Sequence, residues 1–60
     1  MKIIKKHLRL KMNIKLLISA FGFDLFGIYP AVKSDENDGY IASNGRFYNF
    51  FANDECEVVE

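Results

Sequence analysis

The chain of 60 residues carries eight basic and eight acidic side chains, and half of its residues are hydrophobic. This composition excludes a disordered chain of high net charge, and the length excludes a dinucleotide-binding domain, a TIM barrel and most folds with a deep catalytic cleft. One cysteine and one histidine permit neither an internal disulfide nor a four-ligand zinc site, so we expect one small domain over residues 1–60, completed by self-association.

Hydrophobic residues occupy every even position from Leu8 to Ala20, and mostly polar residues occupy the odd positions between them. Such strict alternation is typical of a half-buried strand, so the pattern predicts a long first strand over residues 8–20. The alternative is an N-terminal helix over residues 2–20, because lysine, leucine, arginine and methionine favour helices. No capping residue precedes the run, and this favours the strand.

A second strand and a polar loop follow in the sequence. Residues 25–33 are rich in aromatic and aliphatic side chains, and Pro30 confines such a strand to an edge or an end of the sheet. Residues 34–39 have the composition of a solvated loop. Their spacing does not match the calcium-binding loop of an EF-hand, and we expect no metal and no cofactor.

The clearest local signal is Asn44–Gly45 between two runs of strand-like residues. Asn-Gly favours a two-residue hairpin turn in which both central residues have positive φ. The predicted register therefore pairs Ser43 with Arg46 and Ile41 with Tyr48.

A turn at residues 53–54 and a last strand at residues 56–59 complete the pattern. The predicted fold is mainly β, a small antiparallel sheet or half-open barrel of four or five strands that contains the Asn44–Gly45 hairpin. The alternative is an α+β fold in which an N-terminal helix packs on a hairpin sheet.

The two parts of the chain have opposite charge. Residues 1–23 carry six basic side chains and no acid, whereas residues 24–60 carry two basic side chains and eight acids. Opposite charges favour neutralisation within the chain or association between copies. Residues 1–7 are either part of the domain or a basic N-terminal arm, and Met12 is an alternative start.

An apolar segment after the first lysines imitates a secretory signal or a short membrane span over residues 16–32. Asp24 interrupts this segment, and a charged residue near the centre of a span is unfavourable. We therefore expect a cytoplasmic protein rather than an exported or membrane-spanning one. The single cysteine agrees with a reducing compartment.

No residue pattern indicates an enzyme. His7 has no partner at the spacing of a catalytic pair or a metal site, and we expect it on the surface. Cys56 lies between Glu55 and Glu57, whose negative charge raises a thiol pKa, so we expect a small apolar position in the last strand. The chain has no glycine-rich phosphate loop.

Two kinds of macromolecular partner fit the pattern. A single-stranded nucleic acid would follow the cations on one face of the first strand and stack its bases on aromatic side chains. A protein partner would pair with an exposed edge of the first strand, as a second copy or as a target. The candidate partner-binding residues are Lys5, His7, Arg9, Lys11, Lys15, Tyr40, Arg46, Tyr48 and Phe50.

The protein partner is the favoured hypothesis, because the chain lacks the net positive charge that is usual for nucleic-acid binding. We therefore expect a small non-enzymatic inhibitor or modulator that forms a homo-oligomer, preferably a dimer. Isoleucine, lysine, asparagine, phenylalanine and tyrosine make up 26 of the 60 residues, a bias of AT-rich coding sequence. This bias favours a phage or mobile-element accessory protein of the anti-defence type.

Overall fold

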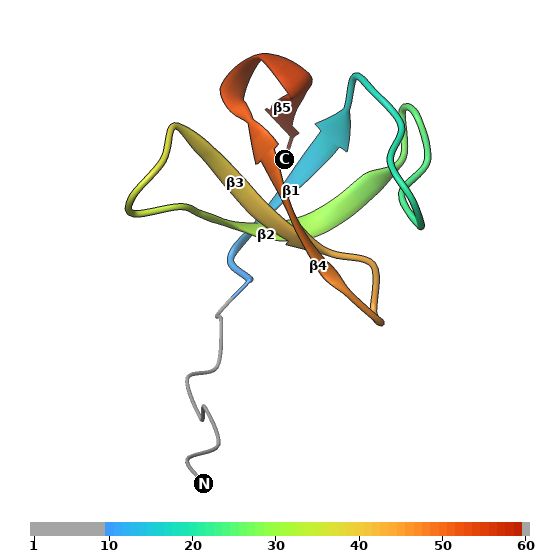
Figure 1. The fold of residues 1–60 in the computed structure, drawn as a ribbon, viewed down its shortest axis with the longest axis horizontal. Coiled ribbons are helices and arrows are strands. Elements are labelled where there is room, and N and C mark those ends of the chain that lie inside the picture. The colour runs from blue at the N-terminus through green and yellow to red at the C-terminus, as the bar shows by residue number, and fades with distance from the viewer. Residues whose placement is uncertain (1–9, 60) are drawn as a thin grey trace, which may run out of the picture.

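The computed structural model describes residues 10–59, and these form one open antiparallel sheet (Figure 1). The strands are β1 (Met12–Leu16), β2 (Ile28–Lys33), β3 (Gly39–Ser43), β4 (Tyr48–Ala52) and β5 (Cys56–Val59). A short 3-10 turn, η1 (Asn53–Glu55), joins β4 to β5. The strands lie in the order β4-β3-β2-β1-β5. The predicted mainly β fold is confirmed, as is the last strand at residues 56–59.

The first strand is shorter than the alternation predicts. Residues 12–16 are extended, and the chain bends at residues 17 and 18, so neither the strand to residue 20 nor the alternative helix is present there. A strand persists only where neighbours accept its backbone hydrogen bonds, and β2 and β5 pair with residues 12–16 alone. Residues 8 and 9 of the predicted strand lie outside the described residues.

The position of β1 also differs from the prediction. It lies between β2 and β5, with Met12 opposite Ala31 and Leu16 opposite Cys56, so both of its sides are paired. A partner could pair with the first strand only if that strand lay at an edge of the sheet, and β1 does not. The edges of the sheet are β4 and β5.

The predicted hairpin is present as β3–β4, but its turn is centred on Gly45–Arg46, because the N–H of Asn44 donates to the carbonyl of Phe47 at 3.2 Å. The register is therefore shifted by two residues from the prediction. Ser43 pairs with Tyr48 instead of Arg46. Within this turn, only Gly45 has a positive φ, 94°. The Oδ1 of Asn44 accepts hydrogen bonds from the backbone N–H groups of Arg46 (2.8 Å) and Phe47 (2.9 Å). These side-chain hydrogen bonds stabilise the observed turn, which replaces the predicted turn in which both central residues have positive φ.

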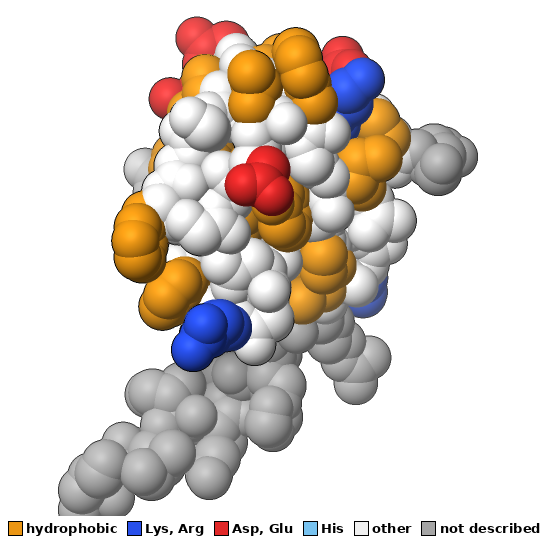
Figure 2. Space-filling view, turned by 90° about the vertical axis from the view of Figure 1, so that its right-hand side faces the viewer, with side chains coloured by type: hydrophobic (Ala, Val, Ile, Leu, Met, Phe, Trp, Pro, Cys, Tyr) orange, Lys and Arg blue, Asp and Glu red, His pale blue; other side chains and the backbone are white. Residues whose placement is uncertain are grey.

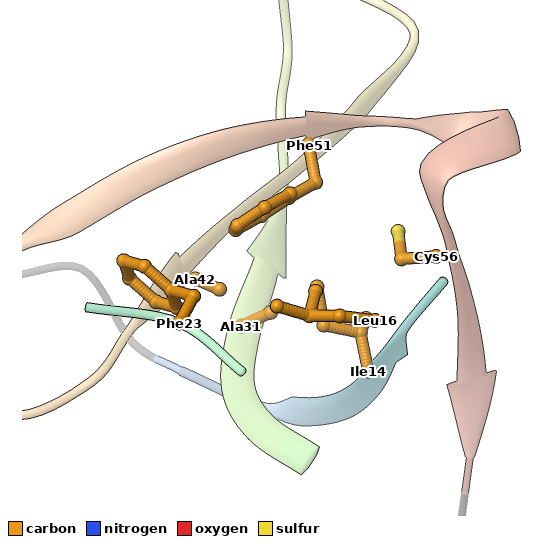
Figure 3. Packing of buried hydrophobic residues seen from close by; sticks show 7 residues of the cluster. All are labelled: Ile14, Leu16, Phe23, Ala31, Ala42, Phe51 and Cys56. Atoms are coloured by element: carbon orange, nitrogen blue, oxygen red, sulfur yellow. The ribbon is translucent and has the colours of Figure 1, made fainter. Parts of the chain in front are cut away.

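The core lies on one face of the sheet and is small (Figure 3). Its buried residues are Ile14, Leu16, Phe23, Ala31, Ala42, Phe51 and Cys56. Phe23 and Phe51 are the buried members of the nine aromatic residues, and they meet edge to face with ring centroids 5.3 Å apart. The expectation that Cys56 is a small apolar position of the last strand is confirmed. Most aromatic side chains therefore lie outside the core.

Candidate partner-binding surface

The connection between β1 and β2, residues 17–27, is a hydrogen-bonded loop (Figure 1). At its base, the N–H of Phe26 donates to the carbonyl of Leu16 at 2.8 Å. Near its tip, Ala20 and Phe23 exchange two backbone hydrogen bonds of 3.0 and 2.8 Å. Backbone hydrogen bonds therefore hold the loop at both its base and its tip.

Phe23 anchors this loop in the core (Figure 3). Its ring is 2% exposed and packs edge to face on Tyr29, with centroids 5.0 Å apart, as well as on Phe51. The hydroxyl of Tyr29 also accepts a hydrogen bond from the backbone N–H of Asp24 at 2.8 Å. The residue in the middle of the loop is thus held by both packing and hydrogen bonding.

A second tie joins the tip of the loop to the β3–β4 turn. The side-chain Nδ2 of Asn44 donates to the carbonyl of Gly22 at 2.7 Å. Gly22 has a φ of 81°, and a Cβ atom there would lie 2.7 Å from the same Nδ2 and 3.2 Å from the Phe47 ring. The close approach therefore requires glycine. Next to it, the rings of Phe21 and Phe47 lie 5.8 Å apart.

Large hydrophobic side chains project into solvent from the loop of residues 17–27 and from the adjacent β3–β4 turn. Phe21 is 87% exposed and Phe26 is 61% exposed. Figure 2 faces the side on which the loop lies and shows hydrophobic side chains across it, with an acidic side chain among them. We define the aromatic loop surface as Leu17, Ile18, Phe21, Leu25, Phe26 and Phe47, all of which are exposed.

Phe26 is held in an unfavourable backbone conformation. Its φ is 66°, and within residues 10–59 it is the one non-glycine residue with positive φ. This conformation costs a bulky residue about 1–3 kcal/mol. Burial of the ring does not compensate for the cost, because the ring remains largely exposed. The Nζ of Lys15 lies 5.8 Å from the ring centroid.

The predicted cations are not assembled into a row by the described residues. Lys5, His7 and Arg9 lie outside residues 10–59. Lys11 is exposed just before β1, and Lys15 is half-buried within β1 beside the aromatic loop surface. Residues 10–59 contain four basic and seven acidic side chains, so this body does not attract a nucleic-acid backbone by its net charge.

The other predicted site residues fall at three separate places. Tyr40 is half-buried beside the core, with the Nζ of Lys33 5.8 Å from its ring centroid. Arg46 lies exposed in the β3–β4 turn. Tyr48 and Phe50 lie on β4 and are 56% and 41% exposed.

The exposed aromatic residues of the loop were missed by the sequence reasoning, although a signal for them exists. Phe21 and Phe26 each precede a glycine, and two aromatic-glycine pairs five residues apart fit poorly within a strand. Both pairs coincide with turns in the structure. The β2 strand accordingly begins at Ile28 rather than at residue 25.

The free edge of β4 is partly blocked by hydrogen bonds within the chain. The backbone groups of Phe50 and Ala52 point away from β3, as the alternation of ladder hydrogen bonds requires. The Ala52 N–H donates to Glu55 Oε1 (2.9 Å), and its carbonyl lies 3.5 Å from the Cys56 thiol. The Phe50 carbonyl accepts from Asn49 Nδ2 (3.1 Å). These contacts disfavour addition of a partner strand to β4.

Chemically reactive arrangements are sparse in the described part of the chain. Residues 10–59 contain no group of three or more His, Cys, Asp or Glu side chains placed to hold a metal ion. They also contain no helix of the length and hydropathy that a membrane crossing requires. Burial raises the pKa of the Cys56 thiol, and the negative charges of Glu55 and Asp54 raise it further.

Comparisons with protein families, with curated proteins and with solved structures found no match.

Proposed function

We propose that this chain is a non-enzymatic binding protein that inhibits or modulates a partner protein by covering part of that partner's surface. The contact is made by the aromatic loop surface. Aromatic side chains are enriched where protein interfaces gain most of their binding energy. The observation that carries the proposal is that one hydrogen-bonded loop presents both the exposed, backbone-strained Phe26 and the almost fully exposed Phe21.

Folding alone gives little reason for this arrangement. A strained exposed phenylalanine lowers stability without adding to the core, and such strain clusters at functional sites. The loop is also ordered before any partner arrives, because its tip and middle are tied to Asn44 and Tyr29. Preorganisation of this kind lowers the entropic cost of binding.

The proposal is tested by comparing partner capture by wild type, Phe21→Ser and a matched control, Val58→Ser, whose side chain is exposed on β5 and belongs neither to the aromatic loop surface nor to strands β2–β4. Proteins retained by wild type and by the control, but not by Phe21→Ser, are candidate partners. With the purified partner, Phe21→Ser should weaken binding at least about tenfold, as loss of an interface anchor does.

Equal capture of the same proteins by wild type and Phe21→Ser would contradict the proposal. Retention of nucleic acid that is lost steeply with added salt would favour the alternative of a nucleic-acid-binding module.

A further inference from the structure

The face of β2, β3 and β4 that lies opposite the core has an unusual composition. Side chains alternate along a strand, and the core includes Ala31, Ala42 and Phe51, so their neighbours in the strands face the other way. These outward positions are Ile28, Pro30, Val32, Gly39, Ile41, Ser43, Tyr48, Phe50 and Ala52. None of them is charged, whereas a solvated face of an antiparallel sheet usually alternates to polar residues.

The centre of this outer face is a continuous apolar row. Val32 pairs with Ile41, which in turn pairs with Phe50, so the three side chains lie side by side across three strands. The Phe50 ring lies over Gly39, where an added Cβ atom would come within 2.6 Å of the ring. Tyr48 extends the row at the edge of the sheet and is 56% exposed.

The charge distribution selects a second copy as the occupant. Residues 10–59 carry four basic and seven acidic side chains, and the outer positions of β2–β4 carry none of them. Residues 1–9 carry four basic side chains and no acid, so each copy also offers charge of the opposite sign to the body of the other.

We infer that the outer face is a contact between two copies of this chain in a two-fold dimer. A two-fold contact is made by the same patch on both partners, and an uncharged apolar row meets this condition. The partial blocking of the β4 edge favours packing of the faces over joining of two copies at that edge. The contact uses none of the residues of the aromatic loop surface, so this inference goes beyond the proposed function.

The dimer is expected to be weak. Three strands of five or six residues present a flat area on the order of 250 Å². A standard interface buries about 800 Å² on each partner, so association should be visible at roughly 0.1–1 mM rather than at nanomolar concentration.

Sedimentation velocity on the full chain tests the inference. The sedimentation coefficient of wild type should rise with concentration over roughly 0.02–1 mM. Tyr48→Asp places a charge in the contact and should raise the dimer dissociation constant at least about tenfold. The matched control is Phe21→Asp, which adds the same charge to the aromatic loop surface and should associate like wild type. Circular dichroism establishes that both variants are folded.

Dilution of labelled wild type, followed by NMR, provides a measurement without substitution. The methyl signals of Val32 and Ile41 should shift with concentration, and those of Ile14, which is fully buried on the other face, should not. A wild-type chain that remains monomeric at about 1 mM, with constant methyl shifts, would overturn the inference. Loss of association in Phe21→Asp but not in Tyr48→Asp would also overturn it, because the contact would then be the loop.

Discussion

At the scale of single residues, Phe26 separates the requirements of folding from those of binding. Its backbone has the conformation that glycine adopts without steric cost, and its exposed ring adds little to the core. Glycine at this position relieves the steric cost but adds freedom to the unfolded chain, so the two effects partly offset one another. The net effect of the two on the free energy of unfolding can be measured.

Phe26→Gly should raise the free energy of unfolding by about 0.5–1 kcal/mol and weaken partner binding. The measurement is urea denaturation of the full chain, together with affinity for the captured partner. Leu25→Gly is the matched control: its side chain is also exposed but its φ is not positive, so it should lose stability. Equal loss of stability in both variants would show that Phe26 is not strained.

Cys56 should make the free energy of unfolding of the protein decrease at alkaline pH. Its raised pKa in the folded chain means that the folded state favours the neutral thiol more than the unfolded state does. Above the ordinary thiol pKa of about 8.5, the unfolded chain loses a proton that the folded chain retains, and the free energy of unfolding should fall as pH rises.

Cys56→Ala should reduce this fall between about pH 8 and 10, as measured by urea denaturation at each pH. A fall of the same size in both proteins would assign it to other groups. Because Cys56 is buried, the thiol of the native protein should also react slowly with an alkylating reagent, which tests the burial independently.

At the scale of elements, one side chain joins two segments that are 22 residues apart in the sequence. Asn44 accepts two hydrogen bonds within its own turn and donates one to the carbonyl of Gly22. The turn of the β3–β4 hairpin and the tip of the aromatic loop are therefore fixed relative to one another by a single amide.

Asn44→Ala should lower the free energy of unfolding by about 1–3 kcal/mol, because each lost hydrogen bond contributes about 1 kcal/mol. Asn44→Asp keeps the acceptor for the turn but loses the donor to Gly22, so it should fold with a smaller loss and show faster amide hydrogen exchange at residues 20–23. Unchanged exchange in Asn44→Asp would show that the amide does not fix the loop.

Local sequence signals located the elements better than they set their ends. Asn44–Gly45 marks the hairpin because few other residues favour such a turn, and residues 56–59 form the last strand as predicted. The length of β1 was not predictable, because alternation continues to Ala20 while the pairing partners end at residue 16. The hairpin register depends on a side-chain hydrogen bond of Asn44, which composition does not reveal.

The candidate surface was harder to predict than the fold. Tyr48 and Phe50 were identified as candidate partner residues and lie exposed, on the face that we assign to self-association. Phe26 was placed within the predicted strand over residues 25–33 and Phe21 between the first two predicted strands, so neither was expected to be exposed in a loop. Exposure of these rings is decided by contacts between segments that are distant in sequence.

At the scale of the whole molecule, the chain has more large apolar side chains than it can bury. The largest fully buried side chains are Phe51, Ile14 and Leu16. The hydrophobic surplus is divided between two regions, the aromatic loop surface and the outer face of β2–β4. A dimer formed through the second region would leave two copies of the first available, so a partner with repeated sites would be held more tightly than by one copy.

The internal hydrogen bonds along the edge of β4 affect how far assembly can proceed. A strand edge with unoccupied donors and acceptors lets each added chain create the next site, and growth then has no natural end. At β4, part of these groups is already occupied by Glu55, Asn49 and Cys56. The outer face of β2–β4, in contrast, is fully covered when two copies pack on it, and it leaves no site for a third copy. The chain can therefore be rich in exposed hydrophobic residues and still favour a finite pair over a growing fibre at this edge.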